Sequence, residues 1–163
     1  MYKKDKAKAA AVYTCGMIAA GVCIALIAFF VYTLSLRTEY RKVCLEINDH
    51  ILTSPASSNF VLKGGMTYPL SDQILEYYNM ALLGDNTVVF NRKECEPTAK
   101  SIVLVISECT LTFTGLEDGS AVNVRWDTPE DSRSYTLRSS SVSFMQMSAY
   151  MNNYLRRTEP IAP

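Results

Sequence analysis

The residue types that most often perform chemistry are sparse in this sequence and are not grouped. Its one histidine, His50, could act as the base for a serine or cysteine nucleophile, but no G-x-S-x-G motif supplies that nucleophile. Cys44, Cys95 and Cys109 are far apart and include no C-x-x-C pair, whereas zinc sites use closely spaced ligands. We therefore predict that the protein is not an enzyme and that it holds no metal and no cofactor.

The charges of the chain balance, with sixteen basic residues against sixteen acidic ones. Binding to nucleic acid depends on an excess of Lys and Arg that neutralises phosphates. No nucleic-acid partner is therefore expected. The acidic residues at positions 127–131 also lack the alternating ligands and the central Gly of a calcium loop.

Cys95 and Cys109 are the most informative pair of cysteines. They bracket about fifteen residues, and in an oxidising compartment a disulfide closing such a loop would contribute about 3 kcal/mol. Two interpretations stay open, a Cys95–Cys109 disulfide or two reduced thiols of which one is buried. Cys44 is then the odd cysteine, and an odd cysteine can pair between two chains.

Residues 9–36 form an uncharged and mostly apolar run after a basic tail at residues 1–8. About 20 apolar residues suffice for a helix to cross a bilayer, and a soluble helix of this length would need a polar face. We therefore predict that residues 9–36 are a transmembrane helix whose partner is the lipid bilayer. Because a signal peptide has only about 7–15 apolar residues, an uncleaved signal anchor is favoured over cleavage near Thr33 and Ser35.

Basic residues on the two sides of this run predict its orientation. Four lysines precede the run, while Arg37, Arg41 and Lys42 follow it. Positive charge tends to remain in the cytoplasm. The chain is therefore expected to be a single-pass protein of the cell membrane, with a cytoplasmic N-terminus and an extracytoplasmic C-terminal domain.

Residues 37–52 are predicted to continue the helix as a juxtamembrane stalk with an apolar stripe. The stripe recurs every three or four residues from Leu36 to Ile51, which is typical of an amphipathic helix. Either it packs on the chain's own domain, or it pairs with a second copy and brings two Cys44 residues within disulfide range. The residues assigned to this self-association as a homodimer are Tyr40, Val43, Cys44, Ile47 and Ile51.

Residues 53–157 are predicted to form an α+β domain, followed by a tail at residues 158–163. The Ser- and Pro-containing start of this region is interpreted as a connector that ends at Gly64 and Gly65. A first helix is expected at residues 71–83, where Ser71 is a good N-cap and Gly84 could close the helix in the left-handed conformation. A second helix is expected at residues 142–156, with caps among Ser139, Ser140 and Ser141.

Between these two helices the apolar residues alternate with polar ones, as in β-strands. Residues 102–106 are apolar throughout, which predicts a central strand that is covered on both faces. Turn residues at 117–119 and at 128–131 separate the strands that follow. The pattern predicts an antiparallel β-meander flanked by helices.

The order of a long apolar helix followed by a sheet resembles the general plan of pilin-like assembly subunits. The chain departs from that family because it lacks a Gly-aromatic cleavage site and a Glu early in the apolar run. The leading hypothesis is a membrane-anchored domain that binds or scaffolds an unidentified protein partner. The alternatives are a subunit of an envelope secretion or pilus-like assembly machine and, from a different class, a small membrane-tethered enzyme.

Overall fold

The structure is a computed structural model that describes residues 2–84, 86–89, 100–116, 121–139 and 143–161. It divides into two compact units, Met1–Leu36 and Arg37–Pro163. The helical elements are α1 (Tyr2–Thr53), the 3₁₀ turn η1 (Ala56–Ser58), α2 (Asp72–Leu83) and α3 (Phe144–Leu155). The strands are β1 (Asn59–Lys63), β2 (Met66–Pro69), β3 (Asn86–Val89), β4 (Ile102–Ile106), β5 (Cys109–Gly115), β6 (Val122–Asp127) and β7 (Ser132–Ser139).

Helix α1 is unbroken from Tyr2 to Thr53, which confirms the predicted continuation of the apolar helix beyond Leu36. It ends two residues before Pro55, since the residue that precedes a proline disfavours the helical conformation. In the first unit its large apolar side chains from Tyr13 to Leu34 are exposed. Among the described residues, one helix is long and apolar enough to cross a membrane, and it is this one.

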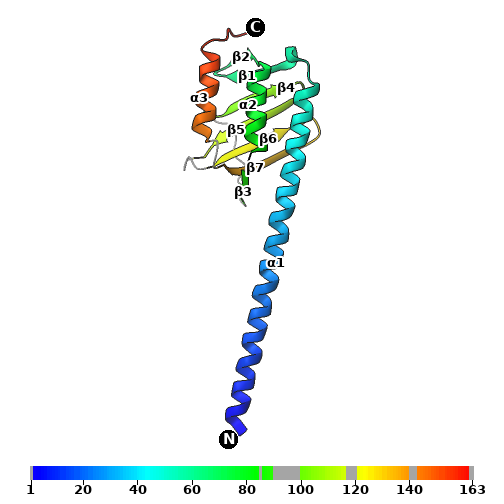
Figure 1. Cartoon of the computed structure of the whole chain (residues 1–163), viewed down its shortest axis with the longest axis vertical. Helices are drawn as coiled ribbons and strands as arrows, with labels where there is room; N and C mark the ends of the chain where they lie inside the picture. The colour runs from blue at the N-terminus through cyan, green and yellow to red at the C-terminus, as the bar shows by residue number, and fades with distance from the viewer. Residues whose placement is uncertain (1, 85, 90–99, 117–120, 140–142, 162–163) are drawn as a thin grey trace. The chain divides into compact units, whose positions relative to one another are not determined.

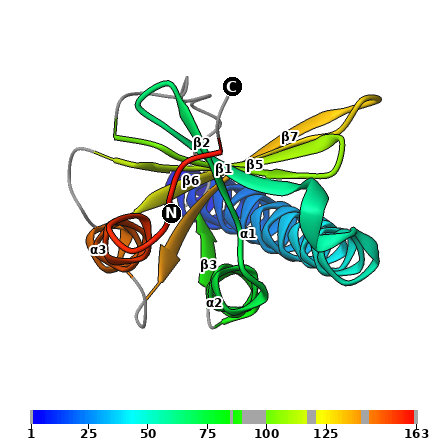
Figure 2. The same ribbon diagram turned by 90° about the horizontal axis from the view of Figure 1, so that it is seen from above.

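The second unit is built on a seven-stranded sheet in the order β2-β1-β4-β5-β6-β7-β3, and Figures 1 and 2 show it from two sides. Every neighbouring pair of strands is antiparallel. Strands β4 to β7 follow each other in sequence and in space, so the predicted meander and the α+β class are confirmed.

The predicted connector before Gly64 and Gly65 was wrong, because a β-hairpin occupies this region. Strands β1 and β2 pair with Lys63 opposite Met66, which leaves Gly64 and Gly65 as a two-residue turn. Their φ angles are 59° and 79°, and a hairpin turn that needs two positive φ angles favours glycine at both positions. The hairpin joins the sheet through β1, which pairs with β4.

The three helices lie on the same face of the sheet, as the view from above shows (Figure 2). On β4 this face carries Ile102, Leu104 and Ile106, which are buried in the core beneath the helices. Val103 and Val105 point to the opposite face and are only half buried. No described helix covers the second face, yet Thr112, which pairs with Val103 there, is only 3% exposed. Coverage of this strand on both faces therefore stays a prediction.

The predicted helix caps are partly corrected. Ser71 is the N-cap of α2, but its side chain makes no capping hydrogen bond, and Gly84 closes the helix in an extended conformation with φ −62° and ψ 179°. Helix α3 is capped by Ser143, whose hydroxyl accepts from the backbone N–H of Gln146 in a capping box. Ser139 lies in β7, and positions 140–142 lie outside the described residues.

Candidate functional site

The stripe that was assigned to self-association lies inside the second unit. Tyr40, Val43, Cys44 and Ile47 are at most 5% exposed, and Ile51 is partly buried against the same core. The Tyr40 hydroxyl donates to the backbone oxygen of Leu82 at 2.9 Å. These side chains pack on the chain's own domain, which is the first of the two alternatives left open by the sequence. Self-association through these residues stays a prediction.

The cysteines of the second unit are also placed in its core where they are described. Cys44 is buried, and its Sγ lies 3.8 Å from the backbone oxygen of Leu82. Cys109 is a buried free thiol, and burial, followed by the charges of Glu46 and Glu108, raises its pKa. Cys95 lies outside the described residues, so a Cys95–Cys109 disulfide stays a prediction.

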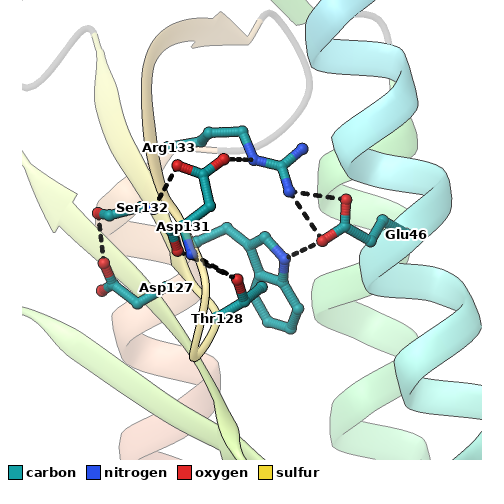
Figure 3. A network of polar contacts seen from close by, with 7 residues as sticks. Glu46, Asp127, Thr128, Asp131, Ser132 and Arg133 are labelled. Atoms are coloured by element: carbon teal, nitrogen blue, oxygen red, sulfur yellow. Dashed lines mark hydrogen bonds and ion pairs between the residues drawn. The ribbon is translucent and has the colours of Figure 1, made fainter.

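Three side chains from separate elements form what we call the polar clamp: Glu46 of α1, Trp126 of β6 and Arg133 of β7 (Figure 3). Trp126 Nε1 donates to Glu46 Oε1 at 2.9 Å. Arg133 Nη2 donates to both carboxylate oxygens, at 2.9 and 2.8 Å. Through three hydrogen bonds from side chains of β6 and β7, this carboxylate holds α1 on the sheet.

The clamp continues into the turn between β6 and β7 (Figure 3). Arg133 Nε lies 3.0 Å from Asp131 Oδ2, and Asp131 Oδ1 accepts from the backbone N–H of Ser132 at 2.8 Å. The acidic residues of this turn therefore orient one another and Arg133. The His50 ring lies 5.5 Å from the Trp126 ring, next to the clamp and without a nucleophile among its described contacts.

The polar clamp was not predicted from the sequence. Glu46 lies beside the apolar stripe of α1, and a charged residue at such a position is usually solvated. The partners are 80 and 87 residues away, so no local spacing connects them. Trp126, in a strand of alternating polar and apolar residues, was the one indication in the sequence that such a contact exists. A buried indole N–H requires a hydrogen-bond acceptor.

Helices α1 and α2 pack side by side and run in opposite directions. Tyr40 contacts Leu82, whereas Asn48, two turns later in α1, accepts from Asn79 Nδ2 at 2.6 Å. As the residue number increases along α1, the number of the contacted residue in α2 decreases, so the two helices are antiparallel. The surface where the two helices meet is hollowed at both ends, and the hollows differ in charge.

The hollow at the C-terminal end of α1 is called the acidic groove. It has a volume of about 750 Å³ and is lined by Leu52, Met80 and Leu83, with the carboxylates of Asp72 and Glu76 beside them. The three apolar side chains are 74%, 64% and 48% exposed. Exposed apolar residues that gather in one concave surface are typical of an interaction site, whereas scattered ones are not.

One polar atom in the lining of this groove lacks a partner. Asn79 Oδ1 is buried and accepts no hydrogen bond from any residue that the structure describes. Its amide nitrogen is already used by Asn48. A buried acceptor that is left unpaired costs about 1–3 kcal/mol.

The hollow at the other end of the α1–α2 surface is called the basic pocket. It has a volume of about 390 Å³, and Arg37, Arg41, Tyr40, Cys44 and Asn86 contribute to its lining. Among the residues that the structure describes, no acidic side chain lines it. Burial raises the pKa of the Tyr40 hydroxyl and of the Cys44 thiol, so both groups are neutral at physiological pH.

Within the part of the chain that the structure describes, no group of three or more His, Cys, Asp or Glu side chains could hold a metal ion. The chain matches no protein-family model, no curated protein and no solved structure.

Proposed function

We propose that this is a non-enzymatic, single-pass protein of the cell membrane whose extracytoplasmic domain docks a protein partner in the acidic groove. The uncharged run at residues 9–36 supports the anchor, and the excess of lysines before it supports a cytoplasmic N-terminus. The observation that carries the docking function is the concave cluster of exposed Leu52, Met80 and Leu83.

The chemistry of the groove favours one class of partner segment, an amphipathic helix with basic residues. Two helices that lie side by side form a groove into which the apolar face of a third helix fits. Asp72 and Glu76 lie along the groove and would attract Lys or Arg of that segment.

The polar clamp supports a binding role over a catalytic one. Glu46 is the carboxylate nearest to an aromatic and histidine neighbourhood, but its oxygens accept three hydrogen bonds within the fold. Such a carboxylate is held in place, and its oxygens are occupied within the fold. We infer that the clamp fixes α1, which forms one wall of the docking groove, on the sheet.

Site-specific photocrosslinking of the full chain in its native membrane tests the docking site. A photoreactive residue at Met80 should give one discrete adduct, while the same residue at Met145, which is 77% exposed on α3, should give none. Charge reversal by Asp72→Lys with Glu76→Lys should abolish the adduct. Asp49→Lys, at an exposed carboxylate that does not line the groove, should preserve it. Equal adducts at positions 80 and 145 would contradict the proposal.

The anchor is tested separately, by carbonate extraction of membranes and sequencing of the mature N-terminus. The chain should remain in the membrane pellet and begin within residues 1–8. Release into the soluble fraction, or a mature start near Leu36, would show that the apolar run is removed or does not span.

A further inference from the structure

Two guanidinium groups line the basic pocket. They belong to Arg37 and Arg41, at the point where α1 enters the second unit. Arg37 is the first charged residue after the run at residues 9–36, and Arg41 lies four residues later. Four residues are about one helical turn, or roughly 6 Å, so both side chains lie on one side of the helix. Both are exposed, and both line the same pocket.

The remaining polar groups of the pocket are already used within the fold. Tyr40 donates its hydroxyl hydrogen to Leu82, and Asn86 Nδ2 donates to the backbone oxygens of Ala81 and Leu82 at 2.8 and 2.9 Å. The phenol and the thiol are neutral. Neither Arg37 nor Arg41 forms an ion pair with a residue that the structure describes. The two guanidinium groups are therefore the charged groups among the described residues that line the pocket.

We propose that the basic pocket binds the phosphate of an anionic phospholipid from the bilayer that anchors the chain. A guanidinium group offers paired N–H donors that match phosphate oxygens. Basic residues next to a membrane span are attracted to anionic headgroups. The pocket volume of about 390 Å³ lies in the range of small-ligand sites, and Leu45 and Leu83 add apolar lining for the glycerol end of the lipid.

This inference rests on the membrane anchor of the proposed function and is independent of the acidic groove. Its test uses the full chain in detergent micelles, where native mass spectrometry counts the lipid molecules that remain bound. The chain is titrated with phosphatidylglycerol and with phosphatidylcholine of the same acyl chains. We expect a preference for phosphatidylglycerol that falls roughly thirtyfold in Arg37→Gln with Arg41→Gln, as two basic residues near a headgroup predict.

Lys42→Gln is the matched control, because Lys42 is an exposed cation of the same helix that does not line the pocket. It should leave the lipid preference unchanged. Unchanged emission of Trp126, the single tryptophan, would show that the variants keep their fold. If Lys42→Gln lost as much lipid preference as the double arginine variant, the lipid site in the pocket would be contradicted. A diffuse attraction to the net charge of the helix would then explain the preference.

A second readout is the alkylation of Cys44, which also lines the pocket. Phosphatidylglycerol should slow the labelling of this thiol, measured by peptide mapping, and phosphatidylcholine should not. Protection by inorganic phosphate in phosphatidylcholine micelles would identify a site for a free anion and overturn the lipid assignment. If the chain stays in the membrane pellet after carbonate extraction but shows neither protection of Cys44 nor a lipid preference, the lipid site is contradicted. The membrane anchor is then still supported.

Discussion

Arg133 of β7 and Glu46 of α1 are joined by one guanidinium nitrogen that lies 2.9 Å from one carboxylate oxygen and 2.8 Å from the other. This pair ties residues 37–53 of α1 to strand β7, across 87 residues of sequence. The two side chains are 31% and 33% exposed, so water screens the pair in part. Its role is to fix the position of α1, which forms one wall of both hollows.

A double-mutant cycle on this pair should measure a coupling of about 1 kcal/mol in the free energy of unfolding. Glu46→Ala should also increase hydrogen exchange in residues 37–53, because it removes the acceptor of both Arg133 and Trp126. The control is Arg125→Ala, which removes an ion pair with Asp127 that has similar exposure but joins two residues of one strand. Equal hydrogen exchange of α1 in the two variants would contradict the role of the clamp.

A fragment that begins at Arg37 should unfold cooperatively, whereas a fragment that begins at Thr53 should not. Tyr40, Val43 and Ile47 belong to the same buried cluster as the sheet residues. Removing the segment would expose the apolar face they cover and leave Trp126 without its acceptor. Urea unfolding followed by Trp126 fluorescence distinguishes the two fragments. A steep transition in the shorter one would mean that the stalk is dispensable.

Two substitutions on adjacent positions of β4 should differ in cost because they lie on opposite faces. Leu104 is fully buried beneath the helices, so Leu104→Ala should lower the free energy of unfolding by about 2–5 kcal/mol. Val103 is half buried on the other face, and Val103→Ala should cost clearly less. Chemical denaturation of both variants checks this order. Equal costs would show that the second face is covered as tightly as the first.

Gly115 of β5 is required because of its contact with Phe144, the first residue of α3. A Cβ atom at position 115 would lie less than 3.0 Å from three ring atoms of Phe144. Gly115→Ala should therefore destabilise the domain by about 1–3 kcal/mol through overpacking. In a Phe144→Leu background the same substitution should cost less, because the ring is gone. A cost that does not depend on residue 144 would rule out this clash as the cause.

Alkaline pH should destabilise the domain through its buried phenols. Burial, followed by the charges of Tyr77 and Tyr150, raises the pKa of Tyr78 above its ordinary value of 10.0. The folded state therefore binds this proton more tightly than the unfolded state, so the contribution is present below about pH 10 and is lost as the pH rises further. Tyr78→Phe should cost about 1 kcal/mol at pH 8, through the lost hydrogen bond to the backbone oxygen of Met147. Above pH 10 its stability should fall less steeply than that of the wild type.

Sequence periodicity predicted the elements whose residues are neighbours in the chain. The uncharged run and the stripe through Ile47 predicted one long helix, because a helical face repeats every three to four residues. Alternation predicted β5 and β6, and Met147 and Met151 predicted the buried face of α3, which is confirmed. The β1–β2 hairpin was missed because its strands are short and begin in a Ser-rich segment, which local composition cannot distinguish from a loop.

The tertiary structure alone decided what each of these surfaces packs against. The stripe of α1 was compatible with a second copy or with the chain's own sheet, and only the folded domain buries Tyr40 against Leu82. The clamp between Glu46 and Arg133 and the two hollows along α1 and α2 were equally unpredictable. Their partners lie tens of residues apart, and contacts at that separation depend on how the sheet and helices assemble. In the sequence, the residues that make these contacts are isolated polar residues that follow no helical or strand periodicity.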